Sequence, residues 1–253
     1  MFVIESVYFI TREADLRTGG KASQARGQTA KASRPGRRTG ATRAVGPTNR
    51  DRLVASAWDL FWSKGYYATS VDDIARQAGL PKGSVYNYFP SKAALLTHVM
   101  GRLKYQTETE LRLKVLKGTM SPSDLVRRLL EHYAELYGEM GFARGDPLGG
   151  RLFELSDTEP ELAAGLRPLL AAWLAVVTQK IWAYATVARI PPLVERADGL
   201  AAIIWAALQG VLLQMKAAHS GEPLIEAQRT LVPMVASYVG ALASGDFPEA
   251  PAQ

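Results

Sequence analysis

The sequence contains no cysteine and only three histidines among its 253 residues. The absence of cysteine excludes disulfide bonds, thiol nucleophiles, thiol redox switches and zinc sites of the cysteine type. His98, His132 and His219 lie far apart and lack the spacing of metal ligands. We therefore expect no metal site and no cofactor.

Long apolar runs are also scarce. We find no uninterrupted run of about 18 apolar residues, the length that a membrane-spanning helix requires. The opening MFVIESVYFI is apolar over only ten residues, carries Glu5 and lacks a preceding basic segment, so it does not have the pattern of a signal peptide. The expected location is the cytoplasm, without a membrane partner.

Strand-like alternation, a glycine loop that could cradle a phosphate, and a catalytic signature are all missing. The composition, 47% apolar and 21% charged, is ordinary for a globular protein. These observations predict an all-α fold and a protein that is not an enzyme.

The formal charge of +6 is distributed unevenly along the chain. Residues 16–50 hold nine Arg or Lys and no acid, whereas residues 51–253 hold 20 basic and 21 acidic residues. Because residues 1–46 have few large apolar side chains beyond the first ten residues, we predict a disordered basic arm there. This arm is either a solvated tail, not necessarily translated, or a segment that contacts nucleic-acid phosphates without reading sequence.

A helical pattern begins at residue 49. Leu53, Ala57, Leu60 and Phe61 form an apolar stripe on a first helix that ends at Gly65. A second helix begins with the capping box at residues 70–73, Ser-Val-Asp-Asp, and ends at a glycine, residue 79. Two short helices joined at a glycine are typical of a helix-turn-helix.

The third helix lies within LPKGSVYNYFPSK, residues 80–92, between one proline that can start a helix and another that ends it. Val85 and Phe89 are spaced i, i+4 and are expected to face the core. The polar and aromatic side chains on the other faces are then accessible to DNA. Ser91 is expected to cap a fourth helix that begins at Lys92.

This segment resembles the DNA-binding domain of the TetR family of bacterial transcriptional regulators. The resemblance covers residues 52–100 without a gap, RLVASAWDLFWSKGYYATSVDDIARQAGLPKGSVYNYFPSKAALLTHVM, including the spacing Tyr86-x-x-Phe89-x-x-Lys92. It implies an all-α protein with a three-helix helix-turn-helix DNA-binding domain followed by a larger helical domain for ligand binding and dimerisation. We place the arm at 1–46, the DNA-binding domain at 47–95, the second domain at 96–245 and a tail at 246–253.

The resemblance also implies which residues bind DNA. Phosphate contacts are expected from Thr69 and Ser70, from the hydroxyl groups of Tyr86 and Tyr88, and from Lys92 at the start of the fourth helix. Base edges or phosphates are expected to contact Lys82, Gly83 and Ser84. Asn87 either pairs with adenine through its amide or contacts a phosphate.

The remainder of the chain is predicted to be helical at 91–117, 123–141, 147–157, 160–189, 193–219 and 223–243, with breaks at glycine and proline clusters. The segment GDPLGGRLFEL resembles one that several branches of the family write as Gly-Cys-x-x-Gly-Asn. Asp146 stands in place of that cysteine, so thiol-based sensing is not available here. The helix that begins at Lys92 is expected to connect the DNA-binding end to a ligand cavity.

The resemblance places the cavity and the dimer surface on the C-terminal helices. Residues expected to line the cavity, of which only some would contact a ligand, are Tyr105, Tyr133, Tyr137, Phe153, Trp173, Trp182, Trp205 and Gln209. Two apolar stripes on the last two helices are expected either to form a homodimer interface or to be core: Ala201, Ile204, Trp205, Leu208, Leu212 and Met215, and then Leu231, Val235, Tyr238 and Val239.

Three functions agree with these patterns. The leading hypothesis is a homodimeric repressor that binds a palindromic double-stranded DNA operator and is released by a small-molecule effector. A second is an activator or global regulator with the same fold. A third, an enzyme or helical binding protein that has acquired a DNA-binding head, is opposed by the missing catalytic constellations.

Overall fold

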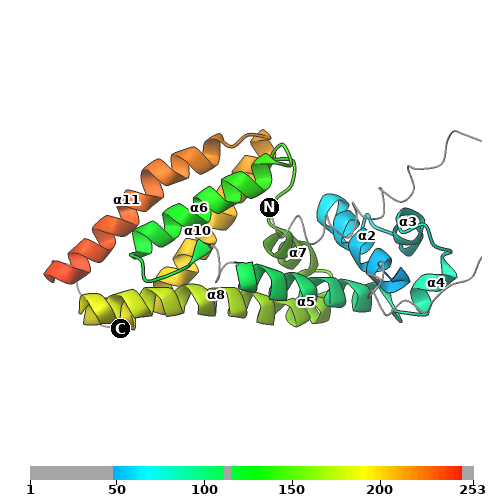
Figure 1. Ribbon diagram of the computed structural model, residues 1–253, viewed down its shortest axis with the longest axis horizontal. Coiled ribbons are helices and arrows are strands. Elements are labelled where there is room, and N and C mark those ends of the chain that lie inside the picture. The colour runs from blue at the N-terminus through cyan, green and yellow to red at the C-terminus, as the bar shows by residue number, and fades with distance from the viewer. Residues whose placement is uncertain (1–47, 111–114, 247–253) are drawn as a thin grey trace, which may run out of the picture.

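The computed structural model describes residues 48–110 and 115–246, with side chains described up to Leu103 and again from Val115 (Figure 1). Within these ranges the chain forms helices and no strand, which confirms the all-α prediction. The helices are α2 Asn49–Lys64, α3 Val71–Gln77, α4 Gly83–Tyr86, α5 Lys92–Glu110, α6 Pro122–Gly138, α7 Pro147–Leu155, α8 Pro160–Ala188, α9 Pro191–Glu195, α10 Ala197–Ala218 and α11 Glu222–Ser244.

Helices α2, α3 and α4 form a head at one end of an elongated molecule (Figure 1). Capping boxes begin two of them, with Thr48 and Asp51 at α2 and with Ser70 and Asp73 at α3. Their inner faces share one core with the start of α5 and with parts of α7 and α8, which includes Leu53, Phe61, Ile74, Val85, Phe89, Leu95, Leu96, Leu148, Leu155, Ala163 and Leu166. The head is therefore packed directly onto the C-terminal domain.

The C-terminal domain is a bundle in which α6 lies beside α11, and α10 lies against α8 (Figure 1). Helix α5 runs from the head along α8. Proline occupies the first turn of α6, α7, α8, α9 and α11, where its missing N–H costs nothing. A second large core fills the bundle and includes Leu129, Tyr137, Val177, Ile204 and Leu208.

One prediction about the last helices needs correction, and one open alternative about them is decided. The helix predicted at 193–219 is divided into α9 and α10, because Arg196 leaves the helical conformation between them. The two apolar stripes, predicted as either dimer interface or core, belong to the core: Ala201, Ile204, Leu208, Leu212, Met215, Val235 and Val239 are buried in the bundle, and Trp205, Leu231 and Tyr238 pack against it. These stripes hold the monomer together.

Helices α8 and α10 are long and apolar enough, by length and composition alone, to cross a membrane. The same test is passed by core helices of soluble proteins, and both helices contribute buried side chains to the bundle core. Their apolar character is thus weak evidence for a membrane segment.

Candidate DNA-binding surface and ligand pocket

The turn between α3 and α4 brings the two short helices close together. Gly79 adopts the left-handed conformation, with φ of +64°, and a Cβ there would lie 2.7 Å from the guanidinium of Arg52. Val85 and Phe89 point into the head core with at most 4% of their surface exposed, as the i, i+4 spacing predicted. Burial of these two side chains fixes which face of α4 is left outside.

That outer face carries most of the predicted DNA-binding residues. Tyr86 and Tyr88 are 53% and 40% exposed although both are aromatic. Lys82, Gly83 and Asn87 are exposed beside them, and Ser84 is half-buried. Lys82 forms an ion pair with Asp72 of α3, with 2.8 Å between Nζ and Oδ2. Exposed hydroxyl, amide and ammonium groups on a short helix are the chemistry that contacts phosphates and base edges.

Ser70 lies at the start of α3, exposed, with its hydroxyl already engaged. The hydroxyl donates to Asp73 Oδ2 at 2.7 Å and accepts the Asp73 N–H at 3.1 Å. The same hydrogen bond holds the pKa of the Asp73 carboxyl below its ordinary value. Ser70 therefore serves as the helix cap, and any phosphate contact would come from this occupied hydroxyl.

Thr69 requires a correction, because its side chain is fully buried. Its hydroxyl donates to the carbonyl of Gly65 at 2.7 Å and to that of Leu60 at 3.2 Å. A hydroxyl without exposed surface cannot reach a phosphate in this conformation. Its role is to close the turn that follows α2.

Lys92 is also directed inward. Its ammonium donates to the carbonyls of Tyr66 and Thr69 at 3.0 and 3.1 Å, and it lies 4.1 Å from the centre of the Tyr66 ring. Burial lowers the pKa of this ammonium. In this conformation the Lys92 ammonium makes internal contacts that tie α5 to the turn after α2, and its phosphate contact stays a prediction.

A pocket of about 490 Å³ lies between α7 and α10, and we call it the α7–α10 pocket. Its lining comprises Trp62, Gly145, Asp146, Gly149, Gly150, Arg151, Leu152, Phe153, Ser156, Leu170, Trp205, Gln209, Leu212, Leu213 and Lys216. Phe153, Trp205 and Gln209 were predicted from the sequence. The apolar walls and the few polar groups suit a small, largely apolar molecule.

The other predicted cavity residues lie elsewhere. Tyr133 and Tyr137 stack in the bundle core, 5.9 Å between ring centres, and Trp173 is buried against Trp205 at 4.8 Å. Trp182 is half exposed on α8 and does not line this pocket. The side chain of Tyr105 lies outside the described residues, as does the basic arm.

Asp146 lines this pocket, although the sequence analysis noted it only as the residue that stands in place of a cysteine. It caps α7 by accepting the N–H of Gly149, beside the amide of Gln209. Burial raises the pKa of the Asp146 carboxyl to about 6, against the lowering effect of the hydrogen bond from Gly149. Any Cβ at position 149 would overlap the amide of Gln209, so glycine permits this close approach. The Asp-Pro pair before an apolar run was the available signal of a cap.

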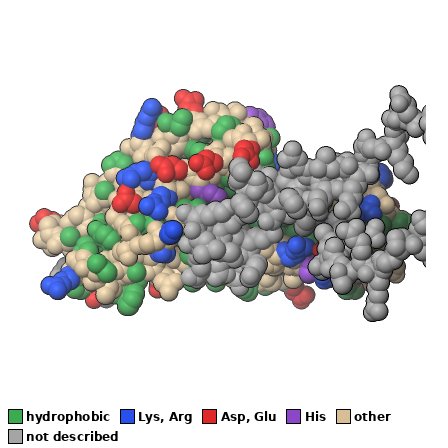
Figure 2. All heavy atoms as spheres, in the orientation of Figure 1, with side chains coloured by type: hydrophobic (Ala, Val, Ile, Leu, Met, Phe, Trp, Pro, Cys, Tyr) green, Lys and Arg blue, Asp and Glu red, His purple; other side chains and the backbone are tan. Residues whose placement is uncertain are grey.

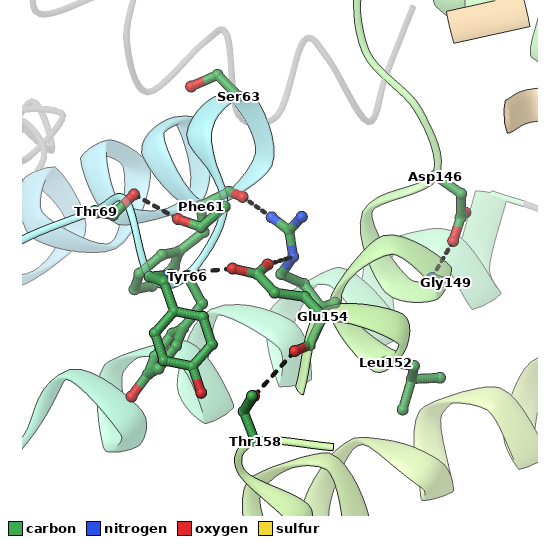
Figure 3. A network of polar contacts seen from close by, with 12 residues as sticks. Phe61, Ser63, Tyr66, Thr69, Asp146, Gly149, Leu152, Glu154 and Thr158 are labelled. Atoms are coloured by element: carbon green, nitrogen blue, oxygen red, sulfur yellow. Dashed lines mark hydrogen bonds and ion pairs between the residues drawn. The ribbon is translucent and has the colours of Figure 1, made fainter. Parts of the chain in front are cut away.

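Two side chains of α7, Arg151 and Glu154, contact the head, and we call them the α7 bracket. Figure 3 shows Glu154 directed toward Phe61 and Tyr66. Arg151 donates from Nη1 to the carbonyl of Phe61, and its Nε lies 2.8 Å from Glu154 Oε2. Glu154 Oε1 accepts the N–H of Tyr67 at 3.0 Å. Sequence spacing could not have shown these contacts, because they join residues about ninety positions apart.

Comparison with known proteins agrees with both halves of this geometry. The model for bacterial regulatory proteins of the tetR family matches residues 53–99. The model for the C-terminal domain of LmrA/YxaF-like transcriptional regulators matches residues 122–230. The chain belongs to the TetR family of transcriptional regulators. Proteins of the TetR family regulate transcription by binding DNA operators as dimers, and they respond to small-molecule ligands.

Several relatives of the TetR family match over most of their length. The HTH-type transcriptional repressor DhaR of Mycobacterium sp. (strain GP1) is 27% identical over 175 residues, 69% of this chain and 86% of DhaR. The regulator LmrA of Bacillus subtilis is 22% identical over 178 residues, 70% of this chain and 91% of LmrA. The solved structure of a TetR regulatory protein from Rhodobacter sphaeroides gives a TM-score of 0.61 at 24% identity, covering 72% of this chain and 96% of that one, and supports the fold.

Proposed function

We propose that this TetR family protein is a repressor that binds a palindromic operator as a homodimer and is released when a small molecule occupies the α7–α10 pocket. The observation that carries the proposal is the outer face of α4, where Tyr86, Asn87 and Tyr88 are exposed while Val85 and Phe89 anchor the helix. Similarity to DhaR, which is named a repressor, favours repression over activation.

The charge distribution supports assigning DNA binding to the head. On the face that Figure 2 shows, acidic and basic side chains are intermingled over the C-terminal helices. A surface of mixed sign gives little net attraction for the phosphate backbone. DNA contact is therefore expected at α4 and its flanks.

A second copy of the chain is proposed to cover the outer faces of α10 and α11. Outside the buried stripes these helices expose apolar and small residues that include Ile203, Ala206, Leu213, Met234 and Gly240. Ile203 and Met234 are 65% and 61% exposed. This surface replaces the stripes predicted from the sequence as the dimer interface, on the same pair of helices.

The test begins with selection of the preferred operator from a random pool of DNA duplexes. The wild-type protein should enrich a palindrome, and Tyr86→Ala should weaken binding to all duplexes while leaving the dimer intact. Asn87→Ala should cost about 1–3 kcal/mol at one base pair per half-site if its amide reads a base. An equal loss on all sequences would make Asn87 a phosphate contact.

The regulatory sign is tested in cells with a reporter placed behind the selected operator. Deletion of the gene should raise reporter transcription, since a repressor blocks the promoter that it occupies. A fall in transcription would assign the protein as an activator instead. Failure of the wild-type protein to enrich any duplex would contradict the DNA-binding proposal itself.

A further inference from the structure

The α7–α10 pocket carries an exposed aromatic ring on its α7 side. Phe153 lines the pocket and is 88% exposed, more than any other large apolar side chain in the described ranges. The face assigned above to a second copy of the chain belongs to α10 and α11 and does not include Phe153. Because exposed apolar surface beside a pocket marks a binding site, this side of the pocket needs an occupant of its own.

The first ten residues, MFVIESVYFI, are a part of the sequence that the proposed function leaves unused. All of them except Glu5 and Ser6 are apolar. Residues 11–47 contain only two large apolar side chains, Leu16 and Val45, and carry the basic excess of the chain. Both stretches lie outside the described residues. An apolar segment that bears an acid gains nothing from DNA phosphates, whereas burial against apolar walls stabilises it.

The connection between this segment and the described chain is long enough to bring the segment to the pocket. Thr48 caps α2 at one end, and Trp62, near the other end of α2, lines the pocket. From Thr48 to Trp62 the helix covers about 21 Å, at about 1.5 Å per residue. Residues 11–47 reach up to about 120 Å when extended, at about 3.3 Å per residue. A segment tethered in this way has an effective concentration on the order of 1 mM at the pocket.

The size and the charge of the pocket agree with part of this segment as the occupant. A volume of about 490 Å³ accommodates a few apolar side chains, and not all ten residues. Leu152, Leu170 and Leu212 supply apolar walls. Lys216 is an exposed basic side chain of the lining, and Glu5 lies in the middle of the segment. Such an exposed pair orients a bound segment more than it adds affinity.

We infer that the first ten residues dock in the α7–α10 pocket of the same chain and compete there with the small-molecule effector. The inference goes beyond the proposed function, because docking requires neither an operator nor a particular effector. At an effective concentration of about 1 mM, a segment that binds as a free peptide with a Kd of about 0.1–1 mM is docked in half or more of the molecules. The same competition weakens the apparent affinity of any other pocket ligand by about 2–10-fold.

Disulfide trapping tests the position of the segment in the full chain, which has no cysteine of its own. Thr11→Cys directly follows the segment, and Ser156→Cys replaces an exposed hydroxyl of the pocket lining. Thr186→Cys, near the C-terminal end of α8, is the matched control. Thr186 is also exposed, and its hydroxyl, like that of Ser156, donates to the carbonyl four residues earlier. On non-reducing gels the pocket pair should cross-link within one chain at least about tenfold faster than the control pair.

A background without the apolar anchors shows whether docking causes the fast cross-linking. The double change Phe2→Asp and Phe9→Asp should slow the pocket pair to the rate of the control pair. The double change Gln24→Asp and Gln28→Asp adds the same charge outside the segment, and it should leave the rate of the pocket pair unchanged.

Competition is measured with 8-anilinonaphthalene-1-sulfonate, an apolar probe whose fluorescence rises on burial. The variant changed at Phe2 and Phe9 should bind this probe about 2–10-fold more tightly than the wild type. Gly150→Leu should remove the difference by filling the pocket, since a Cβ there meets nothing within 4 Å. Gly165→Leu on α8, equally unobstructed but outside the lining, should keep the difference. Thermal melting of each variant confirms that it is folded.

Three results would overturn docking within one chain. They are equal cross-linking of the pocket and control pairs, fast cross-linking that persists without Phe2 and Phe9, and cross-links between two chains, which would assign the pocket to the segment of the partner. Equal affinity of the wild type and the Phe2 and Phe9 variant for the probe would overturn the competition. A wild-type protein that binds no DNA selectively would contradict the proposed function alone, since neither measurement uses DNA.

Discussion

The Lys92 ammonium directs its hydrogen bonds into the protein, toward two carbonyls of the turn after α2. Lys82 differs from it, because its ammonium is exposed and its partner is the exposed carboxylate of Asp72. Exposed ion pairs of this kind contribute little to stability. The two lysines lie on either side of α4, and yet their expected roles differ.

Replacing each lysine by alanine should separate the two roles. Lys92→Ala leaves two carbonyls without their donor, which should lower the free energy of unfolding by about 1–3 kcal/mol. It should leave the dependence of operator affinity on salt unchanged. Lys82→Ala should change stability little and reduce the slope of log K against log salt by about one unit. Denaturant titration and binding at several salt concentrations measure both quantities.

A reduced salt slope in Lys92→Ala, without loss of stability, would restore the phosphate contact that the sequence suggested. The sequence could not decide this, because it specifies a lysine at the start of a helix but not which carbonyls face it. The same holds for Thr69, whose hydroxyl is directed inward and donates to the carbonyl of Gly65. Residue types were predictable, and the direction of these two side chains was not.

At the scale of helices, the capping boxes and glycine ends predicted much of the head. The box at Ser70 and Asp73 and the inward pair Val85 and Phe89 lie where local spacing placed them. Helix α10 was harder, because it carries apolar residues around most of its circumference. Periodicity alone therefore could not distinguish the buried stripe from the exposed face that includes Ile203.

Two helix starts should respond to pH in opposite directions. The hydrogen bond from Ser121 holds the pKa of Asp124, at the start of α6, below its ordinary value. The stabilisation that this hydrogen bond gives the fold is present above the pKa that Asp124 has in the unfolded chain. It is lost as pH falls through the lower pKa that Asp124 has in the folded protein. Burial raises the pKa of Asp146, at the start of α7, from 3.8 to about 6. Ionised Asp146 therefore destabilises the fold increasingly from pH 4 to pH 6.

Substitution by asparagine tests both signs. Asp124→Asn removes a carboxylate from the start of α6 and should lower the free energy of unfolding at neutral pH. The loss should be only about 0.3–1 kcal/mol, because this carboxylate is partly exposed. It should vanish in acid, below the pKa that Asp124 has in the folded protein. Asp146→Asn keeps a good cap and should stabilise the protein by about 1–3 kcal/mol above pH 6, with no gain near pH 4. Urea unfolding at several pH values measures these differences. Parallel pH profiles for the two variants would contradict the assigned environments.

For the whole molecule, the bundle core uses the inner sides of α10 and α11, and their outer sides remain exposed in the single chain. A twofold dimer buries the same patch of both copies and places two recognition helices toward the two halves of a palindrome. The operator affinity of such a protein depends on having both heads on one particle. Dimer loss should therefore weaken DNA binding without any change at α4.

The last prediction tests this arrangement with charges on the proposed interface. The double variant Ile203→Lys and Met234→Lys places two ammonium groups in each copy, at side chains that are otherwise exposed and should not disturb the monomer fold. It should sediment as a monomer and bind the operator about 100-fold or more weakly, because the second head no longer benefits from tethering. Val187→Lys is the control, since Val187 is an apolar residue 74% exposed on α8 outside the proposed face. Analytical ultracentrifugation measures the oligomeric state of each variant. A double variant that stays dimeric, or a control that dissociates as much as the double variant, would show that the interface lies elsewhere.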